Sequence, residues 1–399
     1  MRPLEGITIL DLSRVLACPF ASMILAELGA AVIKVEQPGA GDETRGFEPF
    51  ASGPEGEAVS AYYMACNRSK RSITVNLRHA AGREVIRGLA RRADVLVENF
   101  PVGTLARRGL DHASLKEECP RLITVSCTGF GQDGPYARRK GYDTVFQAMG
   151  GLMSLTGERS GGPVKPGLPV ADLTSGLWVA IAILSALQGR ERTGAGGHVD
   201  VSMLDAQVAL LSIAAARYFA LDEVPPRLGT EHPGRVPSAS FRCADGKYLH
   251  ITCSDQHWVP LCDALGLDAL RADPELAGNA GRVRRREAVM DAIARAMAGL
   301  GRAEAFAKLD AADVPAGPVL NLDEVLADEH VRARGMVASF EHPALGRFPA
   351  LPVPLRFAGW DGPHLSRPPL LGEHTEEVLT EMLGYDAARI AELRAAGAV

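Results

Sequence analysis

The stretch ITILDLSRVLACPFASMILAELGAAVIKV, residues 7–35, sets the pattern that decides the fold. Ile7–Leu12 is rich in β-branched and aliphatic residues, Pro19–Leu28 has helical periodicity, and Ala31–Val35 is again β-rich. A strand, a helix and a second strand in this order form a βαβ unit, whose two strands lie parallel. The opening of the chain therefore predicts an α/β fold.

The same alternation continues to about residue 217. Further strands are expected at residues 73–75, 94–98, 122–126 and 198–202, and helices at residues 79–92, 104–108, 142–150 and 173–188. This pattern predicts a Rossmann-like large domain with a mostly parallel sheet. In such sheets, ligands bind beyond the carboxyl ends of the strands.

The pattern changes after residue 217, where proline and glycine become frequent. Phe241–Cys253 predicts a hairpin with its turn at Asp245-Gly246, followed by helices and by a short edge strand at Val314–Val319. We expect three parts: a large domain over residues 1–217, a linker and small α+β domain over residues 218–322, and a C-terminal segment, 323–399, that returns to the large domain.

Composition excludes several classes of protein. The 399 residues carry a net charge of −5, which gives no electrostatic reason to expect nucleic acid or an anionic membrane as a partner. The ten histidines show no metal-binding spacing, so no metal site is expected. Seven cysteines without a CxxC pair predict reduced thiols and a cytoplasmic protein. No signal-peptide segment precedes the first strand, and the apolar run 173–187 is short for a membrane span.

Asp172 precedes that apolar run and follows a stretch rich in glycine and proline. Aspartate is a favoured residue at the start of a helix, because its carboxylate accepts hydrogen bonds from free backbone amides. The same position fixes an ionised carboxylate near the positive end of the helix dipole. Asp172 is therefore either a helix cap without chemistry or a reactive carboxylate.

Basic and polar residues follow several of the expected strands or precede them. The segment Asn67–Ser72, the pair Asn99-Phe100, Arg107 and the segment Lys140–Asp143 would converge on one anionic ligand if they meet at the carboxyl edge of the sheet. The alternative is a set of solvated loops. Gly39–Arg45 resembles half of a dinucleotide fingerprint but follows the second strand and lacks the third glycine, so a loop beside a ligand cleft is favoured over a dinucleotide site, and a plain surface turn is favoured over both.

Taken together, seven segments resemble the class III CoA-transferase family of the CaiB/BaiF type, in the order in which the family has them. They are Ile9–Ala17, Leu28–Glu36, Asn67–Ser72, Val97–Phe100, Gly141–Asp143, Ala171–Gly176 and Pro368–Thr375. The resemblance extends over nearly the whole chain. It implies an interlocked homodimer of ring-like subunits, whose large domain is built from both chain ends.

The resemblance also implies an activity and a site. The catalytic residue falls on Asp172, which would form an aspartyl–acyl anhydride and then an aspartyl-CoA thioester. Coenzyme A thioester would be a substrate, with no permanently bound cofactor and a small carboxylate as the second substrate. The implied CoA contacts are Leu16, Ala17, Gln37, Asn67, Arg68, Ser69, Lys70, Asn99, Phe100, Arg107 and Lys140, and Tyr142 would lie next to the thioester.

Within the family, the chain looks most similar to the branch that moves CoA from succinyl-CoA to dicarboxylates such as glutarate. A dicarboxylate needs a cation for its far carboxylate, for which Arg14 and Arg235 are candidates. His232 is a candidate for the acceptor site. A structural salt bridge for either arginine, and a loop histidine without a role, remain open as well.

Three other functions stay open. Racemases of the same fold carry Gly-His-Asp where this chain has Gly141-Tyr142-Asp143, and tyrosine, with a pKa of about 10, is a poor second base for an α-proton. A CoA-binding protein without turnover is the second, and a nicotinamide dehydrogenase is the third. Among the transferases, the oxalate-using branch has glutamine at the position of Leu16 and a run of glycines at 253–257, so both positions argue against oxalate.

Overall fold

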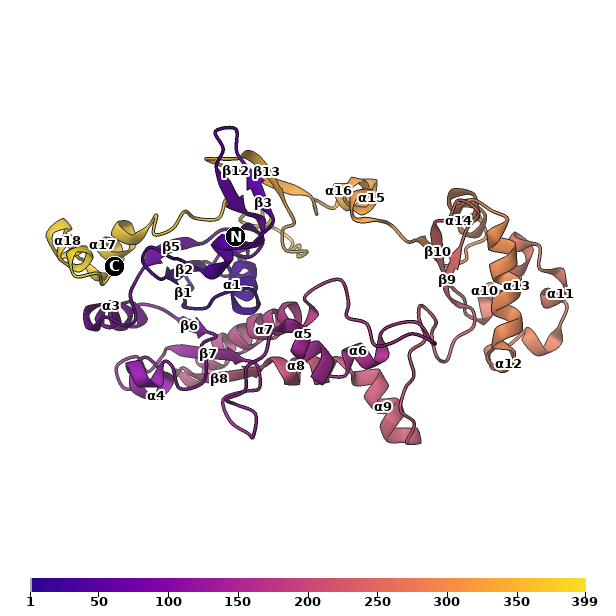
Figure 1. Ribbon diagram of the computed structural model, residues 1–399, viewed down its shortest axis with the longest axis horizontal. Helices are drawn as coiled ribbons and strands as arrows, with labels where there is room; N and C mark the ends of the chain where they lie inside the picture. Colours follow the sequence, from indigo (N-terminus) through magenta and orange to yellow (C-terminus); the bar gives the residue numbers. More distant parts are fainter. Residues whose placement is uncertain (1) are drawn as a thin grey trace. The chain divides into compact units, whose positions relative to one another are not determined.

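The computed structural model describes residues 2–399 (Figure 1). The chain divides into two compact units, each built from separate segments. The first unit contains Met1–Leu152, Lys165–Ala220 and His330–Val399, and the second contains Met153–Val164 and Leu221–Glu329. Both ends of the chain therefore belong to the first unit.

A six-stranded sheet forms the centre of the first unit, with strand order β5-β2-β1-β6-β7-β8 and parallel pairing throughout (Figure 1). Its strands are β1 (Thr8–Asp11), β2 (Ala31–Glu36), β5 (Arg71–Thr74), β6 (Val95–Glu98), β7 (Ile123–Thr128) and β8 (Gly197–Ser202). The chain proceeds outward from β1 on one side and from β6 on the other, so the strand order reverses between these two strands. Ligands of open parallel sheets bind at such a point. The predicted α/β class is confirmed.

Successive residues of each central strand face opposite sides of the sheet, and both sides are covered. Ile9 packs with α1 (Ala17–Glu27) and α7 (Val170–Thr193) on one face. Leu10 packs with α3 (Ala80–Ala90), α4 (His112–Leu115), α17 (Thr375–Leu383) and α18 (Ala387–Ala395) on the other. Burial on both faces explains why these strands are continuously apolar, as parallel strands usually are.

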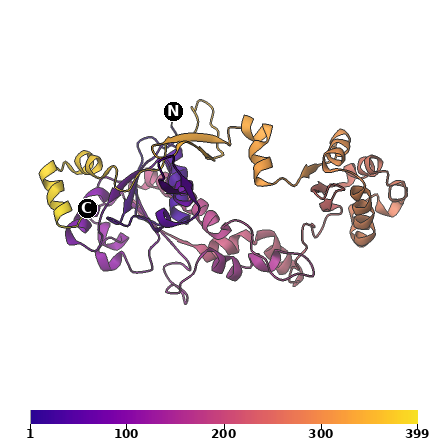
Figure 2. The ribbon, with the colours of Figure 1, turned by 45° about the horizontal axis from the view of Figure 1, so that its top comes forward.

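The C-terminal segment completes the second face. The backbone N–H of His374 donates to the carbonyl of Ser72, which ties the start of α17 to β5. Val378 and Ile390 are fully buried among residues of β1, β2 and α3. Figures 1 and 2 both show α17 and α18 in yellow beside α3. The last 25 residues are therefore part of the core of the first unit.

Helix α7 is longer than the apolar run suggested, because it begins three residues earlier and continues through a polar last turn to Thr193. By length and composition the helix is apolar enough to cross a membrane. Its most apolar stretch of 18 residues has a mean hydropathy of 1.8, and 39% of this stretch is buried within the chain. The expectation that the run is too short for a span was wrong on length. The buried side of α7 packs against α1 and β7.

The second unit has a three-stranded antiparallel sheet, in order β11-β10-β9, packed with short helices. The strands are β9 (Ser238–Arg242), β10 (Tyr248–Thr252) and β11 (Ala316–Pro318). The predicted hairpin and its turn at Asp245-Gly246 are confirmed, as is the short edge strand. The helices are α10 (Asp255–Leu265), α11 (Asp268–Arg271), η3 (Pro274–Leu276), α12 (Asn279–Arg284), α13 (Arg286–Ala298), α14 (Arg302–Ala311) and α15 (Leu322–Ala327).

The remaining elements are short. Two hairpins, which the sequence did not predict, pair β3 (Phe50–Ser52) with β4 (Ala58–Ser60) and β12 (Ala338–His342) with β13 (Gly346–Ala350). The other helices are η1 (Glu43–Gly46), α2 (Ala61–Cys66), η2 (Ala106–Arg108), α5 (Asp143–Met149), α6 (Leu152–Leu155), α8 (Met203–Leu210), α9 (Ser212–Leu221) and α16 (Glu329–Ala333).

Candidate active site

A cavity of about 200 Å³ opens at the carboxyl ends of β1, β2, β5 and β6, where the strand order reverses. Its polar and aromatic lining includes Arg14, Gln37, Asn76, Arg78, Phe100 and Arg108. These side chains come from the loops that follow four different strands. The topology therefore assembles the cavity from distant parts of the sequence, as expected for an open parallel sheet.

The cavity is strongly positive. Burial lowers the pKa of Arg108, and the charges of Arg78, Arg107, Arg14 and Arg83 lower it further. Guanidinium groups that lie this close together repel one another unless an anion is shared between them. Arginine also binds phosphate and carboxylate through paired hydrogen bonds. The arrangement therefore suits a multiply charged anionic ligand.

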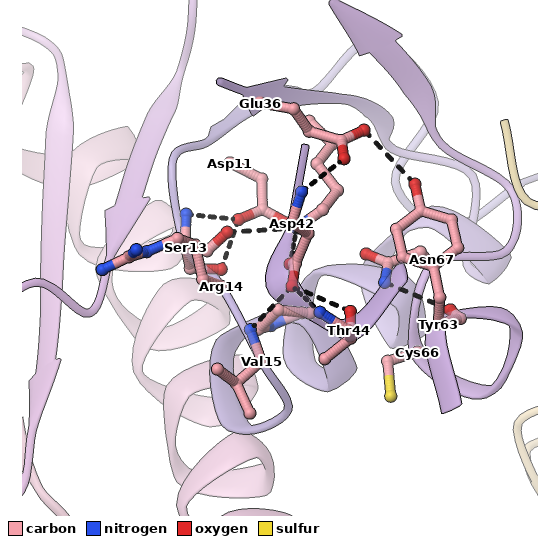
Figure 3. Close-up of polar contacts among 12 residues, drawn as sticks. Asp11, Ser13, Arg14, Val15, Glu36, Asp42, Thr44, Tyr63, Cys66 and Asn67 are labelled. Atoms are coloured by element: carbon pink, nitrogen blue, oxygen red, sulfur yellow. Dashed lines mark hydrogen bonds and ion pairs between the residues drawn. The ribbon is translucent and has the colours of Figure 1, made fainter. Parts of the chain in front are cut away.

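The acidic groups beneath the cavity, Glu36 and Asp42 (Figure 3), do not cancel this charge, because each forms an ion pair with its own cation. Glu36 forms an ion pair with Arg45 at 2.7 Å, and Asp42 forms one with Lys34 at 2.8 Å. Both carboxylates are almost fully buried, and the pKa of each is lowered although burial by itself would raise it. The net charge that faces a ligand is that of the arginines.

The turn between β1 and α1 is held in a strained conformation beside the cavity. Val15 has a φ of 68°, which is unfavourable for a β-branched residue. The side chain of Asn99 accepts the N–H of Arg14 at 2.9 Å and donates to its carbonyl at 2.7 Å. Asp42 accepts the N–H of Val15 at 3.4 Å (Figure 3). These contacts fix the point at which α1 begins, directly after Leu16.

The basic segment expected to meet phosphate uses its charges inside the protein. Lys70 is 4% exposed, and its ammonium donates to Asp11 at 3.1 Å, to the carbonyl of Pro19 and to Asn67. Arg68 is also buried and pairs with Glu27 at 2.9 Å. Both side chains have their hydrogen bonds satisfied within the chain. Their contact with CoA stays a prediction, as does that of Ser69, whose hydroxyl donates to the carbonyl of residue 364.

Three of the other predicted residues lie at or beside the cavity. Gln37 and Phe100 line the cavity. Arg107 lies near enough to Arg108, which also lines it, for its charge to lower the pKa of Arg108. Arg14, predicted as an acceptor contact, also lines the cavity and lies over the ring of Phe100, 5.1 Å from its centre. Arg14 therefore belongs, with Arg78, Arg107 and Arg108, to what we call the arginine cluster.

The remaining predicted residues are placed elsewhere. Leu16 and Ala17 are buried at the start of α1, whereas Lys140 is exposed and Tyr142 is 81% exposed. His232 and Arg235 are exposed residues of the second unit. Their roles stay predictions.

Asp172 is the third residue of α7 and does not cap it. The interpretation of this residue as a helix cap was wrong, because the helix begins at Val170 after Pro169. Its side chain is partly exposed and makes no ion pair among the described residues. Burial, and then the negative charge of Asp143, raise the pKa of Asp172 to about 7. Asp172 is therefore a basic carboxylate that remains free to react.

Close packing connects Asp172 to the cavity. Gly176 lies one turn after Asp172, and a Cβ atom there would lie 2.6 Å from the carbonyl oxygen of Ala17. The absent side chain lets α7 approach the first turn of α1, which borders the turn held by Asn99. The start of α1 is thus in contact with the helix that carries Asp172, and it follows directly after the turn that lines the cavity.

A parallel sheet with an arginine-lined cavity at its switch point, next to a basic carboxylate, defines an α/β protein that acts on an anionic substrate. The family model described as CoA-transferase family III matches residues 4–375. The chain therefore belongs to CoA-transferase family III, and it is an enzyme of the CoA-transferase type.

Individual relatives agree over nearly their whole lengths. The chain is 39% identical to a succinyl-CoA:glutarate CoA-transferase from Homo sapiens, over 100% of this chain and 90% of the relative. It is 40% identical to a succinate–glutarate CoA-transferase from Agrobacterium fabrum, over 95% and 96%. A crystal structure of a CAIB/BAIF family protein from Brucella suis is 42% identical and superposes with a TM-score of 0.85, covering 95% of this chain and 99% of that one.

Sequence reasoning missed Arg78 and Arg108 at the cavity and Asp143 beside Asp172. Arg78 follows the strand at 73–75 by three residues, so the rule that ligands bind at strand ends could have found it. Arg108 is next to the predicted Arg107, and only the short helix η2 decides which of the two side chains enters the cavity. The contact of Asp143 with the start of α7 has no local signal in the sequence.

Proposed function

We propose that the chain transfers CoA from succinyl-CoA to a short dicarboxylate such as glutarate, with Asp172 as the nucleophile. The observation that carries this proposal is a basic, partly exposed carboxylate next to an arginine-lined cavity in a member of this family. The dicarboxylate is supported by the names of relatives at 39% and 40% identity.

The proposed reaction proceeds in two symmetrical halves. The Asp172 carboxylate attacks the thioester carbonyl of succinyl-CoA, which releases CoA thiolate and leaves a mixed anhydride. The thiolate then attacks the aspartyl carbonyl of that anhydride, which releases succinate and forms an aspartyl-CoA thioester. The acceptor carboxylate attacks this thioester and expels the thiolate, which finally attacks the acceptor carbonyl, releases the new acyl-CoA and restores Asp172. Covalent catalysis thus divides one difficult exchange into easier steps.

The test is incubation of the purified protein with succinyl-CoA and a panel of mono- and dicarboxylates in deuterated water, followed by mass spectrometry of the CoA esters. New dicarboxyl-CoA esters without deuterium at the α-carbon are the expected result. Deuterium incorporation without acyl exchange would instead identify a racemase. The absence of both reactions, with CoA still bound, would leave a binding protein and refute the proposal.

The arginine cluster is proposed to hold the phosphates of CoA. Replacing Arg108 with alanine is expected to raise the KM for acyl-CoA about 10- to 100-fold and leave kcat within about twofold, because a charge-assisted hydrogen bond contributes roughly 1.5–3 kcal/mol. Arg71→Ala is the matched control, since Arg71 pairs with Glu377 and Glu381 on the surface of the sheet edge. Steady-state kinetics would contradict the assignment if both variants changed KM equally.

We also propose that the protein is a homodimer of the cytoplasm. The outer side of α7 exposes Leu177, Trp178 and Ile181, each between 44% and 49% exposed, and Ile213 of α9 is 82% exposed. An apolar surface of this kind indicates an interface. The seven cysteines are free and buried, which suits a reducing compartment. Light scattering on the purified chain tests the dimer.

A further inference from the structure

The first turn of α7 lacks a cap of its own. Pro169 precedes the helix and offers no side-chain acceptor. The N–H groups of Val170 and Leu173 donate to the carbonyls of Leu168 and Pro169, at 2.9 and 3.0 Å. The two N–H groups between them, those of Ala171 and Asp172, would be left without partners, which is costly at a partly buried helix start.

A carboxylate from another helix supplies the missing acceptor. Oδ1 of Asp143, the first residue of α5, accepts the N–H of Ala171 at 2.9 Å and that of Asp172 at 3.2 Å. This bridge joins residues 28 and 29 positions apart in the sequence. The helix that carries Asp172 is therefore fixed, at the residue that reacts, by a side chain of α5.

Asp143 is itself held in place. Nε2 of Gln147 donates to Oδ2 of Asp143 at 2.5 Å and also lies 3.3 Å from the carbonyl of Leu168. Gln147 is fully buried. The amide group thus fixes the second oxygen of the carboxylate and ties it to the loop that leads into α7. Both oxygens of Asp143 have defined partners, so its orientation is set before any substrate binds.

Among the charged groups around Asp172, Asp143 is the one that affects the pKa of Asp172 most. The titratable side chains on the elements packed against α7 are Cys18 and Glu27 on α1, Cys127 on β7, Asp143 on α5, Asp205 on α8, and His198 and Asp200 on β8. Tyr62 on α2 also faces Asp172, and burial together with that charge raises the pKa of its phenol to about 12. Among the described residues, burial and Asp143 account for the raised pKa of Asp172, and no cation offsets them.

We propose that Asp143 is the positioning residue of the exchange reaction: it fixes the first turn of α7 and so orients the Asp172 carboxylate towards the thioester. The proposal rests on the function proposed above. Its negative charge also keeps Asp172 basic, and a more basic carboxylate is the stronger nucleophile once ionised. The rate of exchange in the native enzyme should accordingly rise with pH through about 7, where Asp172 loses its proton.

Asp143→Asn separates charge from shape, because asparagine keeps an oxygen acceptor but carries no charge. The pH midpoint of kcat/KM is expected to fall by about one unit, since the repulsion that favours protonated Asp172 is removed. Asp143→Ala removes the acceptor as well. It is expected to lower kcat at least about 10-fold with KM for acyl-CoA within about twofold, because the misplacement of a reacting group costs rate more than binding.

The matched control is Asp386→Asn, because Asp386 caps α18 by accepting the N–H of Arg389 at 2.8 Å and lies on a different helix start. This variant should keep the native pH midpoint and kcat. If Asp143→Ala keeps the native kcat, or if Asp143→Asn keeps the native pH midpoint or moves it upward, the proposal is wrong.

A direct titration keeps this test independent of activity. Carbon NMR of aspartate-labelled protein, with the Asp172 signal assigned by its loss in Asp172→Asn, reports the ionisation of that carboxylate in native protein and in Asp143→Asn. A fall of the midpoint in Asp143→Asn supports the inference that the charge of Asp143 acts on Asp172. If the midpoint falls but no transfer reaction is found, only the proposed function fails. An unchanged midpoint overturns the inference whatever the activity.

Discussion

Replacement of Asp172 by alanine is expected to lower the rate of CoA exchange by about 10⁴-fold or more, while the protein still folds. The acyl group and then CoA would be attached to this carboxylate. The neighbouring carboxylate of Asp143 is not expected to replace it, because both of its oxygens accept hydrogen bonds from within the chain. Its removal is not expected to unfold the chain, because the first turn of α7 is capped by Asp143 and not by Asp172. Exchange between succinyl-CoA and glutarate, measured with circular dichroism as the control for folding, checks both statements.

Asp172→Asn is the sharper variant, since it keeps the volume and polarity of the side chain and removes its charge and, with it, its nucleophilicity. It should be as inactive as Asp172→Ala and should still bind CoA, because the arginines of the cavity are unchanged. Native enzyme stopped during turnover with hydroxylamine should carry a hydroxamate at position 172. Substantial exchange by either variant would exclude the covalent route.

The regular part of the fold could be predicted because its signals are local. The helix predicted at residues 79–92 is α3, Ala80–Ala90, and the apolar strands β1, β2 and β6 each fell within one or two residues of their predicted limits. Burial on both faces of a parallel sheet produces continuous apolar runs, which short windows of sequence reveal. The strand ends then indicated where a ligand would bind.

The details of the site depended on contacts that short windows do not contain. Lys70 was predicted to contact CoA because its segment is basic and matches the family, and that contact stays a prediction, but its burial against the distant carboxylate of Asp11 could not be seen in the sequence. A capping role for Asp172 was considered because aspartate is a favoured first residue of a helix. The carboxylate that accepts the free N–H groups of α7 belongs to Asp143, and its role cannot be seen without the fold. In both cases the deciding partner lies more than 25 residues away.

The carboxylate of Asp11, which forms a buried ion pair with Lys70, should contribute more to stability than a half-exposed carboxylate such as that of Asp263. Both side chains are fully buried, and the carboxylate also accepts hydrogen bonds from the backbone N–H of Ser13 at 2.9 Å and from the hydroxyl of Ser22 at 2.6 Å. Burial alone would raise the pKa of Asp11, but the charges of Lys70 and Lys34, together with the hydrogen bonds from Ser13 and Ser22, lower the pKa to about 2. The folded protein therefore depends on this carboxylate in its ionised form.

Asp11→Asn is expected to reduce the free energy of unfolding by about 3–5 kcal/mol, because Lys70, whose pKa burial lowers to about 8, loses its counter-charge and must then be buried either unpaired or deprotonated. Urea denaturation at pH 7 measures this loss. Asp263→Asn is the matched control, since the ion pair of Asp263 with Arg271 is half exposed and should contribute less than about 1 kcal/mol. A loss for Asp11→Asn as small as that of the control would contradict the prediction.

The same ion pair predicts that the native protein loses stability as the pH falls. Because the pKa of Asp11 is lower in the folded state than its usual value of 3.8, its contribution is fully present above about pH 4 and is lost as the pH falls towards 2. Asp11→Asn should lack this component of the acid transition. The double variant Asp11→Asn with Lys70→Met should recover part of the stability lost by the single variant, because it removes the stranded charge together with its partner and so isolates the coupling between the two groups.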